Sequence, residues 1–210
     1  MTTSTRPEST RGAEAAAGKP VLVVNAGSHS LKLAVLDAEL QTLEQADIDA
    51  APDSSDAADG LSDFLGRAPE VGAIGHRIVH GGPTLRHHCV VDEQVRTALN
   101  DAASLAPQHV PPALAALDTC RDRLPDIPQV ACLDTAFHAT MPEAAYTYPV
   151  PASWRQRYGL RRYGFHGLSY AWTLARTANL LGRDPADLQV VLTHLGGGSS
   201  VCAVRDGHSV

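Results

Sequence analysis

The sequence predicts a mixed α/β fold, and three observations lead to this prediction. Short apolar, often β-branched runs suit buried strands, and they alternate with segments whose apolar residues have helical spacing. Several of these runs end in clusters of glycine and serine, which form turns. A strand–turn–strand pattern also occurs twice, because residues 21–37 align without gaps with residues 190–206. The identical pairs in this alignment are Val21 and Val190, Gly27 and Gly196, Ser30 and Ser199, Ala34 and Ala203, Val35 and Val204, and Asp37 and Asp206.

The first part of the chain contains most of the predicted strands. Residues 21–24 are apolar and β-branched, as in a strand that is buried on both faces, and the turn formers of residues 25–30 connect them to a second strand. Leu61, Phe64 and Leu65 have the spacing of a short helix. The predicted order is strand 21–24, strand 31–37, strand 45–50, a short helix around residues 61–65, strand 71–79 and helix 93–105.

The second part of the chain alternates helices with further strands. Pro111 and Pro112 suit the first turn of a helix, and Gly182 suits the end of another. The predicted order is helix 111–120, strand 130–133, helix 168–181, strand 190–193 and strand 200–204.

The repeated hairpin suggests a duplicated architecture. Residues 1–19 are small and polar, which predicts a disordered tail. We expect a first α/β domain over residues 20–136 and an incomplete start of a second over residues 137–210, because the second hairpin is followed by no further elements. Such a chain is either truncated or one half of something assembled from pieces. The alternative is that the two hairpins are unrelated and share only residues common in any strand–turn–strand.

Composition excludes several classes of function. The 210 residues carry 23 acidic and 17 basic side chains, and the absence of a basic block argues against nucleic acid as a partner. No window approaches the roughly 18 consecutive apolar residues of a membrane span. The four cysteines are scattered without a Cys-x-x-Cys pair, which predicts reduced thiols and neither a zinc site nor a disulfide framework. Because residues 1–19 also lack the apolar core of a secretory signal, we expect a cytoplasmic protein.

The segment of residues 25–30 has the composition of a phosphate-binding loop. Gly27 permits close approach of a phosphate to the backbone, and successive N–H groups in such a loop bind anions. Ser28 and Ser30 add hydroxyl donors, and Lys32 adds a positive charge. Asn25 ends the first strand, where it could contact a phosphate or a water molecule on Mg²⁺.

A second loop of the same kind follows the later strand. It consists of Gly196, Gly197 and Gly198 before two serines. Hairpin turns need the same residues, so one such loop is weak evidence. Two loops, each at a strand end, suggest that they hold one nucleotide between them.

Three further side chains stand at places where chemistry is expected. Arg77, in an apolar strand, is shaped to bind a carboxylate or phosphate, although a structural ion pair would explain it equally well. Asp134 follows an apolar strand and could orient Mg²⁺ or an attacking oxygen. His166 lies in a basic, glycine-flanked segment and could donate to a transferring phosphoryl group, or be a structural histidine.

Taken together, these segments resemble the acetate kinase family. Residues 21–32 resemble its opening signature and residues 161–167 its second signature. Between and after them, in the order of the family, stand residues 75–82, 105–109, 134–138, 148–151 and 194–196.

The resemblance implies both a fold and a reaction. The fold is the ribonuclease H-like, actin-like ATPase fold of acetate and sugar kinases, heat-shock proteins and actin, in which two duplicated α/β domains enclose a nucleotide. The reaction converts ATP and acetate reversibly to ADP and acetyl phosphate with Mg²⁺. The family also implies a homodimer in the cytoplasm.

The resemblance further implies roles for individual residues. Arg77 would bind the substrate, Asp134 would be the catalytic, Mg²⁺-linked aspartate, and His166 would stabilise the transition state. The first phosphate loop would consist of Asn25, Ser28, Ser30 and Lys32, and Asn25 would also contact the metal. The nucleotide phosphates would be bound by His194, Gly196, Gly197 and Gly198. The phosphoryl path would include His109 and His194, and the walls of the acyl pocket would be Val79 and Phe165.

The chain also departs from the family pattern. Gln108 replaces a leucine that lines the acyl pocket, so propionate or another short-chain acid is an alternative substrate. Leu168 and Tyr170 replace the usual threonine and histidine, and Gly197 replaces an asparagine. A second catalytic arginine and the adenosine-binding segments would lie beyond residue 210. We therefore expect weak or absent turnover from this chain alone, and a non-catalytic fragment or half of a split enzyme is a further alternative.

Overall fold

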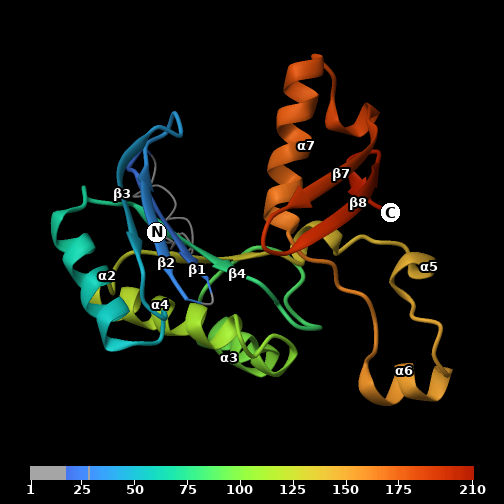
Figure 1. Ribbon diagram of the computed structural model, residues 1–210, viewed down its shortest axis with the longest axis horizontal. Helices are drawn as coiled ribbons and strands as arrows, with labels where there is room; N and C mark the ends of the chain where they lie inside the picture. Colours follow the sequence, from blue (N-terminus) through green and yellow to red (C-terminus); the bar gives the residue numbers. More distant parts are fainter. Residues whose placement is uncertain (1–17, 28) are drawn as a thin grey trace, which may run out of the picture. The chain divides into compact units, whose positions relative to one another are not determined.

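The computed structural model describes residues 18–27 and 29–210, so most of the predicted tail and Ser28 lie outside the described residues. Contacts divide the described chain into two compact units. The first unit runs to Ile78 and continues over Cys89–Ala131, and the second comprises Val79–His88 and Cys132–Val210. Both units are mixtures of strands and helices (Figure 1). The continuous domains expected from the sequence stay a prediction.

A mixed sheet forms the core of the first unit. Its strand order is β3-β2-β1-β4-β6-β5, with β1 parallel to β4 and antiparallel to β2. The predicted strands are confirmed with shifted ends, and the two-residue β5 was missed. The bounds are β1 Val21–Ala26, β2 Leu31–Leu36, β3 Thr42–Ile48, β4 Ala73–Ile78, β5 Cys89–Val90 and β6 Gln129–Leu133, whose last two residues belong to the second unit.

Local capping explains where the helices of the first unit begin. The hydroxyl of Ser54 accepts from the N–H of Ala57 at the start of α2. The carboxylate of Asp92 does the same for Val95 in α3. The short helix expected around residues 61–65 is the longer α2, and the helix expected over residues 93–105 ends as a 3₁₀ turn. The bounds are α2 Ser55–Arg67, α3 Glu93–Ala102, η1 Ala103–Leu105 and α4 Val110–Arg123.

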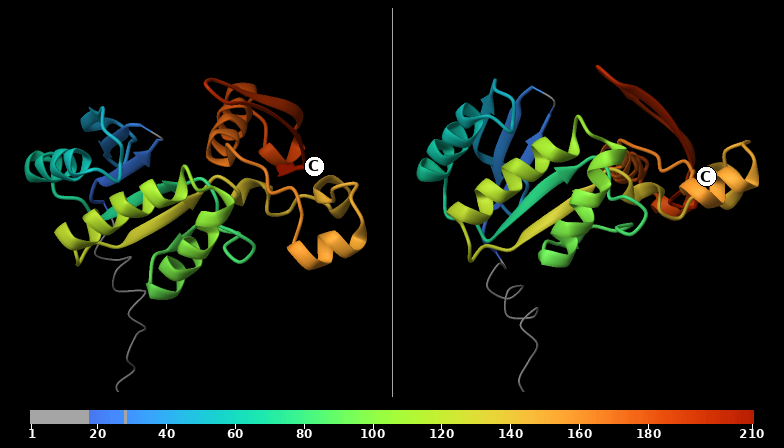
Figure 2. Two further views of the ribbon diagram at one scale, coloured as in Figure 1. Left: turned by 60° about the horizontal axis from the view of Figure 1, so that its bottom comes forward. Right: turned by 90° about the horizontal axis from the view of Figure 1, so that it is seen from below.

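The helices of the first unit bury their apolar faces on the sheet and on each other. Helix α4 contacts β1 and β4, and α2 contacts β3 and α4 (Figure 2). The side chains that this packing buries completely include Leu22, Val35, Phe64, Ile74 and Leu117. Burial of each such side chain contributes roughly 1.5–3 kcal/mol relative to exposure.

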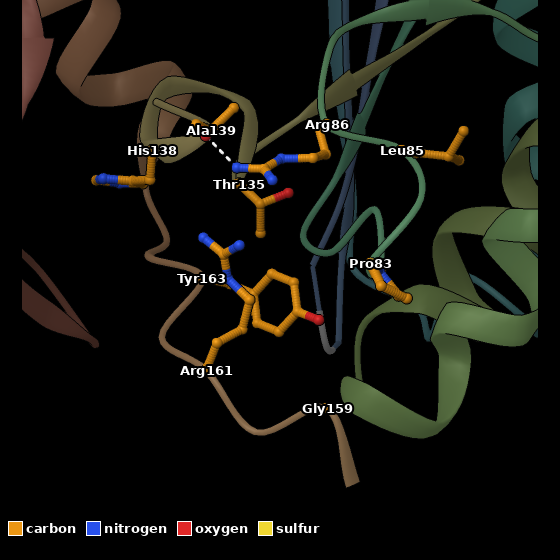
Figure 3. A pocket seen from close by; sticks show the side chains of 10 residues that line it. Pro83, Leu85, Arg86, Thr135, His138, Ala139, Gly159, Arg161 and Tyr163 are labelled. Atoms are coloured by element: carbon orange, nitrogen blue, oxygen red, sulfur yellow. Dashed lines mark hydrogen bonds between the residues drawn. The ribbon is translucent and has the colours of Figure 1, made fainter. Parts of the chain in front are cut away.

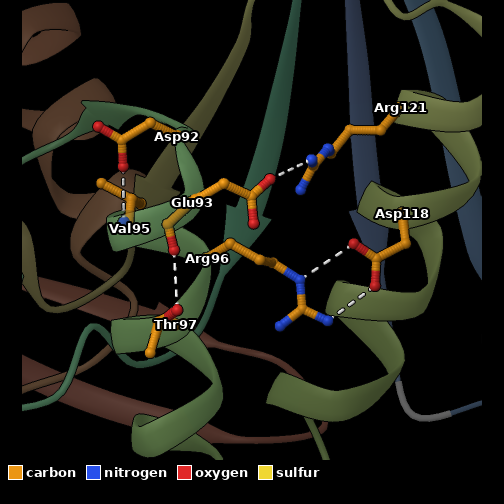
Figure 4. A network of polar contacts seen from close by, with 7 residues as sticks. All are labelled: Asp92, Glu93, Val95, Arg96, Thr97, Asp118 and Arg121. Atoms are coloured by element: carbon orange, nitrogen blue, oxygen red, sulfur yellow. Dashed lines mark hydrogen bonds and ion pairs between the residues drawn. The ribbon is translucent and has the colours of Figure 1, made fainter.

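Helices α3 and α4 are also joined by polar contacts (Figure 4). The guanidinium of Arg96 donates two hydrogen bonds to the carboxylate of Asp118, at 3.0 and 2.7 Å. Arg121 on α4 pairs with Glu93 in the first turn of α3. Both pairs link neighbouring faces of α3 and α4 and add to the contact between the two helices.

The second unit combines one hairpin with one long helix. The hairpin strands are β7 Gln189–Leu195 and β8 Ser199–Arg205, extended by β9 His208–Ser209, and the helix is α7 Gly167–Leu181. Tyr170, Leu174 and Ala178 on α7 pack with Leu192 and Cys202 of the hairpin in a buried cluster. The short elements that the sequence did not predict are η2 Ala136–His138, α5 Glu143–Tyr146, α6 Ala152–Tyr158 and η3 Pro185–Asp187.

The two hairpins share a topology, but the gap-free alignment between them is wrong in the first strand. That alignment matches buried Val24 with exposed Thr193, whereas buried Leu192 would be its counterpart on the inner face. In the second strand it matches buried Val35 with buried Val204. Side chains alternate between faces along a strand, so an offset of one residue in the first strand alone restores both buried faces.

No helix within the described ranges 18–27 and 29–210 is both long enough and apolar enough to span a bilayer.

Candidate functional site

Asn25 and Arg77 come together at the carboxyl ends of two parallel strands in the first unit. β1 and β4 pair with Val24 beside His76, so Asn25 and Arg77 are the next neighbours. Nη1 of Arg77 donates to Oδ1 of Asn25 at 3.2 Å. Ligands of α/β sheets bind at the carboxyl ends of strands. The predicted substrate-binding arginine therefore lies beside the asparagine of the first loop.

Lys32 lies across the hairpin from Asn25, on the same side of the sheet. Its Nζ is 3.2 Å from Oδ2 of Asp47 on β3, and the two side chains are 61% and 60% exposed. An ion pair this exposed is weakly stabilising, so an anionic ligand could take the place of Asp47. Asn25, Lys32 and Asp47 line a groove of about 510 Å³.

The loop between β1 and β2 is closed by its own backbone. The N–H of Gly27 donates to the carbonyl of Ser30 at 2.8 Å, which forms a tight turn. Ser28 lies outside the described residues. The phosphate-binding roles assigned to this loop stay predictions.

His109 is the residue that precedes α4, and its side chain is half-buried. Its carbonyl accepts from the N–H of Ala113, the usual first bond of a helix. Its assignment to the phosphoryl path also stays a prediction.

Asp134 joins β6 to the start of α7 in the second unit. Its side chain is 2% exposed, and its carbonyl accepts from the N–H of Gly167 at 2.9 Å. A Cβ atom at Gly167 would lie 2.1 Å from that carbonyl oxygen, so only glycine fits. The backbone of Asp134 thus holds the first residue of α7, directly after His166.

An aromatic cluster surrounds His80, a residue that the sequence did not single out for the acyl site. Its ring meets the edges of Tyr163 and Phe165 at centroid distances of 4.5 and 5.6 Å. Burial lowers the pKa of His80, and its Nδ1 accepts from the N–H of Gly82 at 2.8 Å. Phe165 is 42% exposed, so one face of this cluster is open to ligand. Val79 is half-buried immediately before His80.

His138 fixes the segment that leads to His166. Its Nε2 donates to the carbonyl of Phe165 at 3.1 Å, because a carbonyl can only accept, and its Nδ1 then accepts from the hydroxyl of Ser209 at 2.9 Å. The His138 ring lies so close to Gly164 that a Cβ there would be 2.4 Å away. Burial lowers the pKa of His138, against smaller opposing effects of the hydrogen bond to Phe165 and of Asp134.

The imidazoles of His166 and His194 stack face to face. Their centroids are 4.1 Å apart and their planes differ by 19°. Nδ1 of His166 is 2.7 Å from the hydroxyl of Ser200, and Nδ1 of His194 is 3.0 Å from that of Ser169. His194 and Ser200 are a cross-strand pair of β7 and β8, which places both beside the start of α7.

The second glycine loop lies next to these imidazoles. A Cβ at Gly198 would be 3.8 Å from the His166 ring, and one at Gly196 would be 3.7 Å from Nε2 of His194. Around Gly197 a Cβ would meet nothing within 4 Å. Two nitrogen-bearing rings beside an open backbone loop can donate hydrogen bonds to a phosphate group.

A separate pocket of about 210 Å³ lies in the same unit (Figure 3). Arg86 donates to the carbonyl of Ala139 at its edge. The guanidinium of Arg161 stacks on the ring of Tyr146, with 3.9 Å between Cζ and the centroid. Both arginines and Tyr163 line this pocket together with small and apolar residues, so basic and aromatic groups form part of its wall.

The structure brings several of the predicted residues together in two groups, one in each unit. Asn25, Lys32 and Arg77 share one side of the first sheet. His166, His194 and the glycine loop gather in the second unit. Sequence reasoning missed Ser169 and Ser200, which lie within hydrogen-bond distance of the two imidazoles, and assigned no site role to His80 and His138. Tyr170 stood out only as a departure from the family pattern.

Comparison with known proteins identifies a family. A sequence model of the acetokinase family matches residues 58–210, a range that begins after the first predicted phosphate loop. An acetate kinase from Geobacter metallireducens is 46% identical over 152 residues, which are 72% of this chain and 36% of that protein. An acetate kinase from Nostoc sp. is 44% identical over 151 residues, 72% and 37% respectively. The chain thus spans little more than a third of these relatives.

Two solved structures resemble the fold closely. A crystal structure of Porphyromonas gingivalis acetate kinase matches with a TM-score of 0.81 and 29% identity, over 91% of this chain and 56% of that one. A propionate kinase from Francisella tularensis matches with the same values. The predicted actin-like α/β fold of acetate and propionate kinases is therefore confirmed.

Proposed function

This chain belongs to the acetokinase family, and from that premise we propose that it is part of a kinase that phosphorylates acetate. ATP and acetate would be converted reversibly to ADP and acetyl phosphate. The observation that carries the proposal is the stacked pair of His166 and His194 beside the second glycine loop. Phosphoryl transfer needs donors placed where charge develops, and little covalent chemistry from the protein.

Each role that the family resemblance implies is consistent with what the side chain offers. His166 donates to the equatorial oxygens of the transferring phosphoryl group, and His194 contacts the nucleotide phosphates with the glycine loop. Arg77 binds the carboxylate of acetate, since a guanidinium and a carboxylate match in geometry. The aromatic cluster at Phe165, with Val79, forms the apolar wall that the methyl group requires.

The oxygen donors among the described residues suit a Mg²⁺ ion that has only one or two protein ligands. Within residues 18–27 and 29–210, no three His, Cys, Asp or Glu side chains form a group that could hold a metal. Mg²⁺ in kinases is held by one or two protein oxygens together with phosphates and water. Asn25 in the first unit and Asp134 in the second each carry an oxygen of this type, and the ion, when bound, would neutralise charge on the phosphates.

Propionate is a second candidate substrate. The propionate kinase structure matches this chain as well as the acetate kinase structure does. Gln108 is exposed in place of the expected leucine, and Phe165 leaves the wall of the aromatic cluster partly open.

We extend the proposal to a homodimer in the cytoplasm and to domains over residues 20–136 and 137–210.

The test measures ADP formation by the purified chain with Mg-ATP and either acetate or propionate. We expect slow ADP formation that depends on the acid, because the chain covers only part of its relatives. His166→Ala should remove it, and His87→Ala, at an exposed position, should not. Equal ADP formation with and without the acid, or in His166→Ala, would contradict the proposal.

A further inference from the structure

Tyr170, Ser200 and His166 form a chain of hydrogen bonds within the second unit. The hydroxyl of Tyr170 is 2.5 Å from the hydroxyl of Ser200, which is in turn 2.7 Å from Nδ1 of His166. Tyr170 is in the first turn of α7, Ser200 is on β8, and His166 immediately precedes α7. Tyr170 is 2% exposed, so water does not compete for its hydroxyl.

The chemistry of the three groups favours one direction of donation. A phenol is a good donor and a poor acceptor, because its oxygen lone pair is shared with the ring. Tyr170 therefore donates to Ser200. The hydroxyl of Ser200 has one proton, which then points to Nδ1 of His166. A neutral imidazole that accepts at Nδ1 carries its proton on Nε2.

We propose that Tyr170, acting through Ser200, is a positioning residue that holds His166 as its Nε2–H tautomer. The inference rests on the proposed function for its purpose, because an Nε2–H group beside the glycine loop is the donor that a phosphoryl group needs. The acetate kinase pattern usually has histidine at the position of Tyr170. An imidazole can be donor or acceptor, whereas a phenol strongly prefers to donate. The tyrosine of this chain therefore sets the direction of the hydrogen bond to Ser200.

His194 provides an internal comparison. Its Nδ1 is 3.0 Å from the hydroxyl of Ser169, and no hydrogen bond to a tyrosine is seen at Ser169 in the described part of the chain. Loss of the Tyr170 hydroxyl should therefore change the tautomer of His166 and leave that of His194 as it was.

The experiment reads the tautomer directly. Long-range ¹⁵N–¹H correlation spectra of the whole chain, without nucleotide, distinguish protonated from unprotonated ring nitrogens at a pH where both imidazoles are neutral. We expect His166 to be Nε2–H in the wild type. Tyr170→Phe should raise the Nδ1–H fraction of His166 about fivefold, the weight of one ordinary hydrogen bond.

Two further variants serve as controls. Tyr158→Phe removes a phenol hydroxyl from an exposed position and should leave both histidines unchanged. Ser200→Ala removes the connecting hydroxyl and should shift His166 at least as far as Tyr170→Phe, which covers the case in which the latter perturbs packing. Resonances of the buried cluster around Leu174 report whether the fold is kept.

The outcomes are distinct from those of the activity assay, since no step of the reaction is measured. An Nδ1–H tautomer of His166 in the wild type would overturn the inference. So would a spectrum of folded Tyr170→Phe in which His166 is unchanged. If the tautomer behaves as expected but His166→Ala keeps acid-dependent ADP formation, only the proposed function fails.

Discussion

At the scale of single residues, burial decides the protonation of His76 on β4. The side chain is 1% exposed, and its Nε2 is 2.6 Å from Oε1 of Gln129. Nδ1 has no hydrogen-bond partner within the described part of the chain. Burial, the largest cause, lowers the pKa of His76 to about 4, against a smaller opposing effect of the Gln129 hydrogen bond.

This burial predicts loss of stability in mild acid. Unfolded histidine titrates at about 6.5, so between that pH and about 4 the unfolded chain binds a proton that folded His76 does not. The free energy of unfolding should fall by about 2 kcal/mol between about pH 7 and about pH 5 from this residue alone.

Urea unfolding at both pH values measures the effect. The double variant His76→Leu, Gln129→Leu removes both partners and should show a correspondingly smaller fall. An unchanged pH dependence in the double variant would mean that other groups are responsible.

Glycine at position 167 is required by the close approach of α7 to Asp134. A Cβ there would lie 2.1 Å from a backbone oxygen, which cannot move without displacing the strand end. Gly167→Ala should lower the free energy of unfolding by about 1–3 kcal/mol, the usual cost of overpacking.

Thermal unfolding of Gly167→Ala and the wild type measures this effect, and Gly66→Ala is the matched control. A Cβ at Gly66 meets nothing within 4 Å, and the residue is helical. Alanine there should raise stability by roughly 0.5–1 kcal/mol. Effects of the same sign at both positions would refute the steric explanation.

At the scale of elements, the contact between α3 and α4 includes two ion pairs of unequal strength. Arg96 is 23% exposed and binds Asp118 through two hydrogen bonds. Arg121 and Glu93 are 40% and 80% exposed. Geometry and partial burial make the first pair the stronger one, since exposed pairs are screened by water.

A double-mutant cycle on each pair tests this ranking. For Arg96→Gln with Asp118→Asn we expect a coupling energy of about 0.5–1 kcal/mol. For Arg121→Gln with Glu93→Gln we expect less than about 0.3 kcal/mol. The reverse order would show that exposure does not decide the strength of these contacts.

Elements were predicted well where their own pattern was strong. The helices with capping residues and apolar spacing were found, and so were the apolar strands. The short helices α5 and α6 escaped prediction because no buried residue marks them. Helices as short as these are marginal on their own and leave no long periodic pattern in the sequence.

At the scale of the whole molecule, the hairpin of the second unit has one covered and one uncovered face. Leu192 and Cys202 are buried beneath α7, whereas Val191, Leu195 and Val201 are 67%, 78% and 70% exposed. The strand β7 also lies at the edge of its sheet, where its backbone groups can pair with a strand of another chain. The exposed apolar face can pack against another chain.

This exposed face predicts self-association of the chain. Sedimentation equilibrium should show association that Val201→Lys weakens about tenfold, since the charge interrupts the apolar surface. Leu40→Lys, at an exposed apolar residue of the first unit, is the control and should have no effect. Equal association of all three proteins would exclude this face as the interface.

The sequence by itself determined the family, whereas the kind of chemistry that it indicated stays a prediction. The segments of residues 21–32 and 161–167 are contiguous, so their residue types were enough to indicate phosphate and carboxylate binding. Most strands and long helices were also visible, because each buries a face with a period that the chain itself carries.

Only the tertiary structure decided how the side chains are oriented. Ser200 reaches His166 and Tyr170 from a strand that lies 34 and 30 residues further along, through the register of β7 and β8 and the packing of α7. The offset of one residue in the alignment of β1 with β7 likewise became visible only from the face of the hairpin that α7 buries. Register and packing depend on contacts between distant segments, and a shift of one residue turns every side chain of a strand to the other face.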